Sequence, residues 1–307
     1  MSMVAKALPH IIAAQQFDQA FLENLFLRAE KLEMSLSQCM QGKRLATIFY
    51  EPSTRTRLSF EAAALGLGGG VISTENAGEF SSAVKGESLK DSVRIISGYA
   101  DVIVLRHPED KAAEEAAEVA EVPVINAGSG REQHPTQALL DLYTIKKECG
   151  GIDGVTVAMV GDLRNGRTIR SLAYLLGKYA GIKIFFVSAK ALQVGDDIKE
   201  YLARHGIQYE EAGRLEDVID KVDVLYQTRV QKERLASGLD YEHLKTALRV
   251  DRAMAERMRK GAIIMHPLPR VGEIDEEVDS LPQAAYFRQA KNGLYVRMAL
   301  LQWIFER

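Results

Sequence analysis

Short runs of β-branched and other apolar residues alternate with longer amphipathic stretches along almost the whole chain. In such a pattern each short run is a strand, and the stretch that follows carries the chain back to the start of the next strand. Parallel strands need crossovers of this kind, which are usually helical. The alternation therefore predicts the α/β class, with one open parallel sheet in each half of the chain.

The apolar runs and the periodic stretches assign the elements. Strands are predicted at residues 44–50, 101–105 and 122–126 in the first half, and at 155–160, 183–187, 223–226 and 262–265 in the second. Helices are predicted at residues 17–34, 114–120, 135–148 and 293–305. Residues 73–87 are polar and rich in Gly and Ser, so we expect an exposed loop there. The change of domain is expected near the helix at 135–148.

Length and charge limit the kinds of ligand. The chain has 307 residues, about two domains at ~150 residues each. Lys plus Arg number 39 and Asp plus Glu 42, a net charge of −3. The basic excess that supports nonspecific nucleic-acid binding is missing, so no nucleic-acid partner is expected. An anionic ligand must be held by a local cluster of positive side chains.

Cysteine usage and hydropathy bear on location. The chain contains only Cys39 and Cys149, with no CxxC pair, which argues against a disulfide framework and a structural zinc site. No run approaches the ~18 apolar residues of a membrane span. Pro9 and His10 interrupt the N-terminal apolar patch, which makes it a poor signal peptide. We expect a cytoplasmic protein with no membrane partner.

The strongest local signal follows the first predicted strand, where residues 52–57 read PSTRTR at the opening of a helix. Unpaired N–H groups at a helix N-terminus bind anions, and the hydroxyl and guanidinium groups here add donors suited to phosphate. The plainer alternative is that Ser53 or Thr54 only caps the helix. Arg55 and Arg57, two residues apart, favour the anion site.

Two further candidates follow strands in the first half. Arg106 comes at the carboxyl end of the strand at 101–105, which is where open α/β sheets bind ligands. His134 precedes Pro135 at a helix start, with Gln137 one turn on, and a neutral imidazole there can donate a hydrogen bond to a carbonyl oxygen. Taken singly, Arg106 could be a surface residue and His134 a helix-start residue.

The second half offers three clusters at strand ends. The segment GDLRNGRT resembles a dinucleotide turn only weakly, and Ser188 stands where an acidic ribose ligand would be expected, so no nicotinamide cofactor is predicted. Its arginines suit carboxylates instead. The second cluster contains Arg229, Gln231 and Arg234. The third contains His266, Pro267, Leu268, Pro269 and Arg270. For each cluster alone, a charged surface loop is the default alternative.

Five segments together carry a resemblance to a known family. EPSTRTRLSFE, HPTQALLDLYTI, GDLRNGRT, TRVQKER and HPLPR occur in this order and are similar to motifs of the aspartate/ornithine carbamoyltransferase family. The ornithine branch typically has HCLP where this chain has Pro267, so the resemblance is to the aspartate branch. It implies two open, mainly parallel α/β sandwich domains with an active-site cleft between them. Residues 1–134 with a returning helix at 292–307 would bind carbamoyl phosphate, and residues 135–291 would bind aspartate.

The resemblance also implies the reaction and the residues that perform it. The carbamoyl group of carbamoyl phosphate would pass to the amine of L-aspartate, in de novo pyrimidine biosynthesis, without a cofactor or metal. Arg55, Thr56, Lys85, Arg106 and His134 would be catalytic. The implied carbamoyl phosphate ligands are Ser53, Thr54, Arg55, Thr56, Arg106, His134 and Gln137, and the implied aspartate ligands are Lys85, Arg167, Arg229, Gln231, Pro267 and Leu268. Ser81 and Lys85 would reach a neighbouring subunit's site, which implies a homotrimer with shared active sites.

Some features depart from the family or leave alternatives open. Gly66 replaces the arginine of an RLG segment, and Arg170 stands where the family normally has histidine. Regulatory chains or other pyrimidine-pathway enzymes are possible partners. One alternative is a carbamoyltransferase for another amine, such as ornithine, although a cationic substrate would want acidic partners where this chain has Arg229 and Gln231. The other is a noncatalytic anion-binding protein with the same fold.

Overall fold

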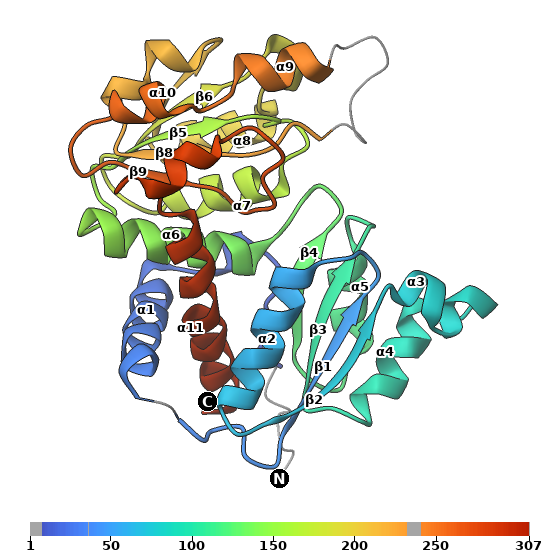
Figure 1. Cartoon of the computed structure of the whole chain (residues 1–307). Coiled ribbons are helices and arrows are strands. Elements are labelled where there is room, and N and C mark those ends of the chain that lie inside the picture. Colours follow the sequence, from blue (N-terminus) through green and yellow to red (C-terminus); the bar gives the residue numbers. More distant parts are fainter. Residues whose placement is uncertain (1–7, 36, 232–240, 307) are drawn as a thin grey trace. The chain divides into compact units, whose positions relative to one another are not determined.

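A computed structural model describes residues 8–35, 37–231 and 241–306, apart from the side chains of residues 243–245. The chain forms two compact units. The first ends at Thr136 and includes the residues from Gly293 onward, and the second spans Gln137–Asn292. Each unit is built on one sheet whose strands are all parallel (Figure 1).

The first unit contains a sheet in the order β2-β1-β3-β4. Its strands are β1 (Arg44–Phe49), β2 (Gly70–Glu75), β3 (Val102–His107) and β4 (Val124–Ser129). Its helices are η1 (Ala14–Gln16), α1 (Gln19–Met34), α2 (Thr54–Gly66), α3 (Ala77–Phe80), η2 (Ser82–Lys85), α4 (Leu89–Ser97), α5 (Ala112–Val119) and the later turns of α11 (Tyr286–Phe305).

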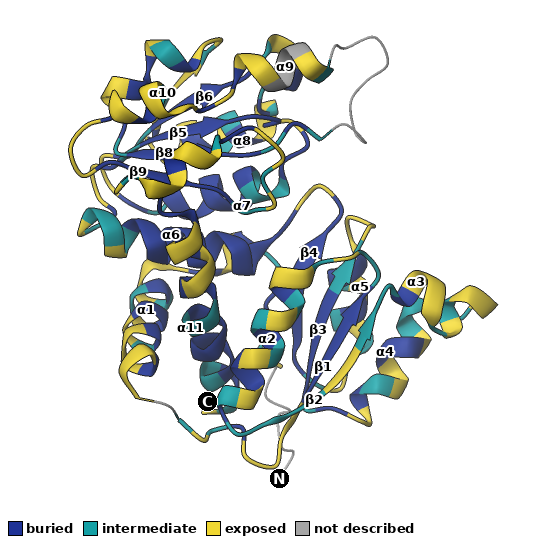
Figure 2. Ribbon diagram, viewed as in Figure 1, coloured by how far each residue is buried: buried dark blue, intermediate teal, exposed yellow. Residues whose placement is uncertain are grey.

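The two faces of β1 are covered by different helices, because side chains alternate along a strand. Ala46 and Ile48 pack with Val93 of α4 and Ala116 of α5 in one apolar cluster. Thr47, between them in sequence, points to the other face and donates a hydrogen bond to Glu61 of α2 at 2.9 Å. The central strands β1 and β3 are buried over most of their length (Figure 2).

The second unit contains a sheet in the order β7-β6-β5-β8-β9. Its strands are β5 (Thr156–Val160), β6 (Lys183–Val187), β7 (Gln208–Ala212), β8 (Val224–Gln227) and β9 (Ile263–Met265). Its helices are α6 (Pro135–Cys149), α7 (Arg167–Leu176), η3 (Lys190–Leu192), α8 (Asp196–Arg204), η4 (Leu215–Asp217), η5 (Ile219–Lys221), α9 (Tyr241–Ala247), α10 (Arg252–Glu256) and η7 (Glu276–Ser280). Ala158, Phe185, Leu225 and Ile264 join the core on one face of this sheet.

The observed structure confirms the α/β class and the parallel sheets, and every predicted strand overlaps an observed one. Two strands were missed, β2 and β7, and both lie at the outer edge of their sheets. Both are incompletely buried and carry polar residues, so they lack a continuous apolar run, unlike the buried edge strands β4 and β9. The prediction of a loop at 73–87 was wrong in part, because residues 73–75 end β2 and the rest includes α3 and η2.

Among the described residues, no helix combines the length and the apolar character that crossing a membrane requires.

Neighbouring residues on α1 give a test of the core. Phe26 is fully buried, whereas Leu27 is 51% exposed. We expect Phe26→Ala to lower the free energy of unfolding by about 3–5 kcal/mol, because it leaves a cavity, and Leu27→Ala to change it by less than about 0.5 kcal/mol. Urea unfolding followed by circular dichroism measures both. Equal losses for the two variants would show that α1 does not pack as described.

Candidate functional site

Functional candidates of the first unit follow its strands at the carboxyl edge of the sheet. Strand β1 leads into α2, β3 ends with Arg106 and His107, and β4 leads to the turn before His134. Phe49 pairs with Arg106, and the backbone N–H of Tyr50 donates to the Arg106 carbonyl at 2.9 Å. Parallel pairing therefore places Arg106 beside the entry to α2.

The N-terminus of α2 has the character of an anion site. Ser53 occupies the N-cap position, but its side chain makes no capping hydrogen bond, contrary to the plainer alternative for Ser53. Arg55 is exposed and forms no ion pair with any residue in the described ranges. Partial burial lowers the pKa of Arg55 from its ordinary value. Thr56 is buried, 6% exposed, while Thr54 is exposed. The helix N-terminus and the Arg55 guanidinium therefore offer donors for an anion.

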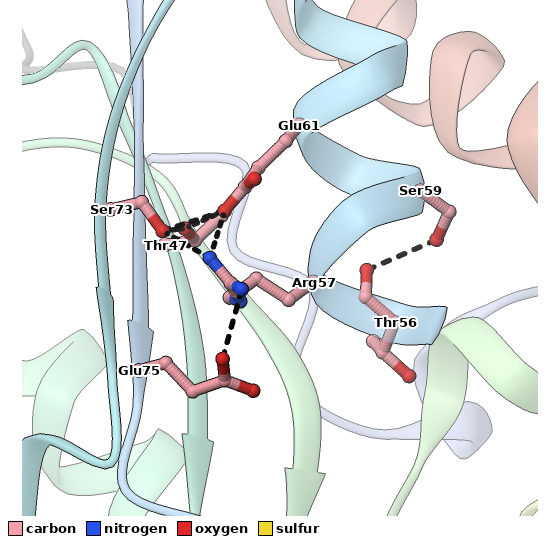
Figure 3. Close-up of polar contacts among 7 residues, drawn as sticks. All are labelled: Thr47, Thr56, Arg57, Ser59, Glu61, Ser73 and Glu75. Carbon is pink, nitrogen blue, oxygen red and sulfur yellow. Dashed lines mark hydrogen bonds and ion pairs between the residues drawn. The ribbon is translucent and has the colours of Figure 1, made fainter. Parts of the chain in front are cut away.

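Arg57, unlike the exposed Arg55, lies among polar side chains of α2 and β2, and Figure 3 shows these contacts of Arg57. Its guanidinium donates to Glu61 of α2 at 3.3 Å and, on β2, to the hydroxyl of Ser73 at 3.1 Å and the carboxylate of Glu75 at 2.9 Å. These contacts hold α2 against the edge strand. Of the two arginines in the motif, Arg57 is engaged within the fold.

Arg106 and His134 are held by the surrounding chain. The Nε of Arg106 lies 3.4 Å from the carboxylate of Glu51, and its side chain is 15% exposed. Its guanidinium also donates to the carbonyl of Ala127 at 3.4 Å. His134 is buried, 4% exposed, immediately before α6 begins at Pro135.

The segment from Asn76 to Glu87 carries both polar and apolar side chains that are exposed to solvent. The hydroxyl of Ser81 accepts a hydrogen bond from the backbone N–H of Ala83 at 3.2 Å, and Lys85 is exposed. Phe80, on the short helix α3, is 78% exposed. Beside this segment lies a pocket of about 150 Å³ whose lining includes Ser81, Tyr50 and Glu87.

The carboxyl edge of the second sheet gathers the other candidates. Strand β5 leads through Gly161 to Arg167 at the start of α7, and β8 leads to Thr228, Arg229 and Gln231. Gly161 has φ of 120°, and a Cβ there would lie 2.3 Å from the Thr228 carbonyl oxygen, so only glycine allows this approach. The amide of Gln231 donates to the Asn165 carbonyl at 3.2 Å. The loops after β5 and β8 are thus joined, and Arg167 and Arg229 follow them. Arg234 lies outside the described residues.

The remaining arginine of the α7 turn has a structural contact. Arg170 forms an ion pair with Asp197 of α8, and its guanidinium also donates to the second oxygen of that carboxylate at 3.3 Å. The histidine expected from the family is thus replaced by a residue that links two helices.

Strand β9 leads to the HPLP segment. Pro267 and Leu268 are half-buried, and Leu268 has φ of 54°, in the left-handed region that branched residues rarely adopt. The backbone N–H of Leu268 donates to Nδ1 of His266 at 2.7 Å. Gln137, on α6, donates through Nε2 to Oδ1 of Asp141 at 2.8 Å. The Gln137 amide and the Leu268 backbone are therefore each held by a buried polar side chain, Asp141 and His266 respectively.

Sequence reasoning did not identify three buried residues that contact these groups. They are Asp141, Gln289, whose amide donates to Asp141 at 2.7 Å, and Glu273, which lies 2.7 Å from Nε2 of His266. A signal for Asp141 was available, since it lies four residues after Gln137 and so on the same face of a helix. It also interrupts an otherwise apolar stretch, ALLDLY. A buried carboxylate in such a stretch needs hydrogen-bond partners. The partners Gln289 and Tyr226 are distant in sequence, so only the fold reveals them.

Comparisons with known proteins agree with this architecture. Residues 9–147 match the family described as aspartate/ornithine carbamoyltransferase, carbamoyl-P binding domain. Residues 153–304 match the family described as aspartate/ornithine carbamoyltransferase, Asp/Orn binding domain.

Individual relatives match over nearly the full chain. An aspartate carbamoyltransferase of rice (Oryza sativa subsp. japonica), named as chloroplastic, is 55% identical over 95% of this chain and 84% of its own. The crystal structure of the catalytic subunit of Methanocaldococcus jannaschii aspartate transcarbamoylase has a TM-score of 0.90 at 48% identity, covering 97% of this chain and 98% of its own. A Trypanosoma cruzi aspartate transcarbamoylase, solved with carbamoyl phosphate and aspartate, has a TM-score of 0.90 at 40% identity, covering 97% and 95%. The chain therefore belongs to the aspartate/ornithine carbamoyltransferase family.

Proposed function

We propose that this protein transfers the carbamoyl group of carbamoyl phosphate to the amine of L-aspartate, giving N-carbamoyl-L-aspartate and phosphate, as a step of pyrimidine biosynthesis. The observation that carries the proposal is the match, at 49–56% identity over 95% or more of this chain, to relatives named aspartate carbamoyltransferase. Family membership makes the protein a carbamoyltransferase. The residues at both sheet edges support the choice of aspartate.

The phosphate end of carbamoyl phosphate is assigned to the N-terminus of α2. Ser53, Thr54, Arg55 and Thr56 supply hydroxyl, backbone and guanidinium donors there, and Arg106 adds a second guanidinium. Charge-assisted hydrogen bonds of this kind are about twice as strong as neutral ones. The absence of a capping bond from Ser53 supports this assignment, because the helix N–H groups are not satisfied by that side chain.

The carbamoyl carbon is the point of attack. Thr56, Arg106 and His134 are assigned to donate to the carbamoyl oxygen, which becomes negatively charged in the tetrahedral intermediate. Gln137 and the backbone of Leu268 are assigned to the carbamoyl NH₂. The protein supplies no nucleophile, since the uncharged α-amine of aspartate attacks directly. The departing phosphate is a suitable acceptor for the amine proton, so the proposal requires no cofactor or metal.

Aspartate is assigned to the second unit. Arg167 and Arg229 provide guanidinium groups for its two carboxylates, and Gln231 can both donate and accept. Pro267 and Leu268 complete the set through the backbone, and Lys85 adds a positive charge. Ornithine, with a cationic side chain, would find guanidinium groups where it needs carboxylates.

Assembly and location are further parts of the proposal. We propose a homotrimer in which Ser81 and Lys85 contribute to the site of a neighbouring subunit. The 78% exposure of Phe80 supports this, because a large apolar side chain on a projecting segment is suited to a protein contact. We also propose that the protein works in the cytoplasm, and the free thiols of Cys39 and Cys149 fit a reducing compartment.

The choice of substrate is tested by offering the amines separately. With carbamoyl phosphate present, we expect a colorimetric assay for ureido products to show turnover of L-aspartate. We expect kcat/KM for L-ornithine to be lower by at least about 10³-fold, because its cationic side chain would meet the guanidinium groups of Arg167 and Arg229 and leave them without a carboxylate. Turnover of ornithine but not aspartate would reverse the assignment, and no turnover of either amine would favour an anion-binding protein.

Because the two arginines of the α2 motif have different environments, we expect their substitution to have different effects. We expect Arg55→Ala to reduce kcat/KM for carbamoyl phosphate by roughly 10²-fold through loss of charged donors, with little effect on melting temperature. Arg57→Met should instead lower the unfolding free energy by about 1–3 kcal/mol, since it leaves Glu61 and Glu75 without their cation. Steady-state kinetics and thermal melting of both variants check this. If Arg57→Met lost more activity than Arg55→Ala at equal stability, the roles would be reversed.

Shared sites are tested by mixing two inactive variants. Lys85→Ala and Arg55→Ala chains, unfolded together and reassembled, can form hybrids in which one subunit supplies Arg55 and its neighbour supplies Lys85. Random assembly of trimers from equal amounts should restore about a quarter of the wild-type sites, because a head-to-tail ring pairs an intact Arg55 with a neighbour's intact Lys85 at about one site in four. Each variant reassembled alone is the control. Absence of recovery in hybrids verified by mass spectrometry would place Lys85 in its own subunit's site.

A further inference from the structure

A buried set of hydrogen bonds in the second unit centres on the carboxylate of Asp141, which is fully buried. Oδ1 accepts from the side-chain amides of Gln137 at 2.8 Å and Gln289 at 2.7 Å. Oδ2 accepts from the hydroxyl of Tyr226 at 2.6 Å. Burial, followed by the charge of Asp141, raises the pKa of Tyr226 well above its ordinary value, so the phenol stays protonated and donates. Three donors thus converge on one carboxylate.

This convergence determines the orientation of the Gln137 amide. An ionised carboxylate only accepts hydrogen bonds, so the group that faces it must be the NH₂ end of the amide. The oxygen Oε1 then lies at the other corner of the same planar group. A reversed amide would place Oε1 against the carboxylate and present Nε2 in its place. Asp141 therefore decides whether Gln137 offers an acceptor or a donor to a ligand.

The same carboxylate orients a second amide. Gln289 donates through Nε2 to Asp141, and its Oε1 accepts from the backbone N–H of His266 at 2.8 Å. Reversal of this amide would put two donors face to face. The His266 backbone is thereby held at the end of β9, where the HPLP segment begins.

The imidazole of His266 continues the series to Leu268. Nδ1 accepts from the Leu268 N–H at 2.7 Å, so the ring proton is on Nε2, which lies 2.7 Å from the carboxylate of Glu273. The other oxygen of Glu273 accepts from the Val271 N–H at 2.7 Å. Both His266 and Glu273 are buried. Each of these hydrogen bonds has only one possible donor, and together they connect Gln137, through Asp141, Gln289 and His266, to the backbone of Leu268.

We propose that Asp141 is a positioning residue for carbamoyl recognition, because it holds Gln137 with its amide oxygen presented to the carbamoyl NH₂ and, through Gln289 and His266, holds the Leu268 backbone. The inference rests on the roles proposed above for Gln137 and Leu268. Asp141 itself touches no substrate. Its loss therefore weakens recognition of the carbamoyl group and leaves recognition of phosphate unchanged.

Two probes separate these effects. Phosphonoacetamide has a primary amide on a phosphonate that does not transfer, so its binding reports both ends of the site, whereas inorganic phosphate reports the phosphate end alone. Calorimetry on the full-length protein gives both Kd values. We expect Asp141→Leu to raise the Kd for phosphonoacetamide by about 10-fold or more. The reason is that the amide oxygen of Gln137 is then no longer held toward the ligand, and a donor can take its place. The Kd for phosphate should change by less than about twofold.

A conservative substitution distinguishes the acceptor from the charge. In Asp141→Asn, the amide oxygen can still accept from both glutamines, and the Tyr226 hydroxyl can turn to accept from the new NH₂ group. This variant should keep phosphonoacetamide affinity within about threefold of wild type. If Asp141→Leu fails to fold, Asp141→Leu with Tyr226→Phe removes a buried donor along with its acceptor, and the same Kd pattern is expected.

A matched control lies one helical turn further along. Asn292 of α11 donates to the hydroxyl of Thr144 on α6 at 3.0 Å, so it joins the same two helices as Asp141 and Gln289 do. Asn292→Leu should lower the melting temperature and leave both Kd values unchanged. Two results would overturn the inference by showing a general packing effect. One is an equal loss of affinity for phosphate and for phosphonoacetamide in Asp141→Leu, and the other is a selective loss of phosphonoacetamide affinity in Asn292→Leu.

Gln137→Ala separates this inference from the proposed function. We expect Gln137→Ala to weaken binding of phosphonoacetamide and not of phosphate. In that background Asp141→Leu should cause a smaller loss than it does in the wild-type protein, because only the contribution through Leu268 remains to be lost. If Gln137→Ala leaves phosphonoacetamide binding intact, the role proposed for Gln137 fails, and the inference fails with it. If Gln137→Ala weakens binding and Asp141→Leu does not, the inference alone is wrong.

Discussion

Parallel pairing of the strands is the constraint on which the other features of this protein depend. Each strand must be followed by a crossover, so the carboxyl ends of all strands in a sheet lie along one edge. Residues far apart in sequence then come together in each unit, as Arg106 of β3 does with the entry to α2 beside β1. In the second unit, the bond from Gln231 to Asn165 joins the loops after β8 and β5 in the same way.

The first unit assigns different tasks to similar residues at its sheet edge. Arg55 and Arg57 are two positions apart at the start of one helix, so their side chains point in different directions. Arg57 faces the edge strand and is neutralised by Glu61 and Glu75, which fastens α2 to β2. Arg55 is left exposed beside helix N–H groups that Ser53 does not cap. Arg57 is thus used within the fold, whereas Arg55 is available for the anion contact that we propose.

In the second unit, buried hydrogen bonds hold the groups that we propose for carbamoyl recognition, Gln137 and the Leu268 backbone. A buried carboxylate is costly unless its oxygens are satisfied, and the three donors around Asp141 meet this need. Such a network also removes alternatives, because an amide that donates to a carboxylate cannot turn over without losing that bond. The side chain of Gln137 and the backbone near Leu268 are held by one continuous set of contacts, which suits recognition of a small polar group.

Much of the fold could be predicted from the sequence. Strands buried on both faces must be apolar, as β1, β3, β5 and β8 are, and the helices that cover them must have a periodic pattern of apolar residues. The PSTRTR motif likewise marked a helix start, which α2 confirms. The edge strands β2 and β7 escaped prediction, since partial exposure permits Ser73 and Glu210 there. The partners of Arg57 and Asp141 also could not be predicted, because Glu75 and Gln289 reach them only through tertiary packing.

Local composition and periodicity therefore determined the elements and the candidate residues, whereas three-dimensional proximity decided which charges are neutralised and which donors stay exposed to a ligand.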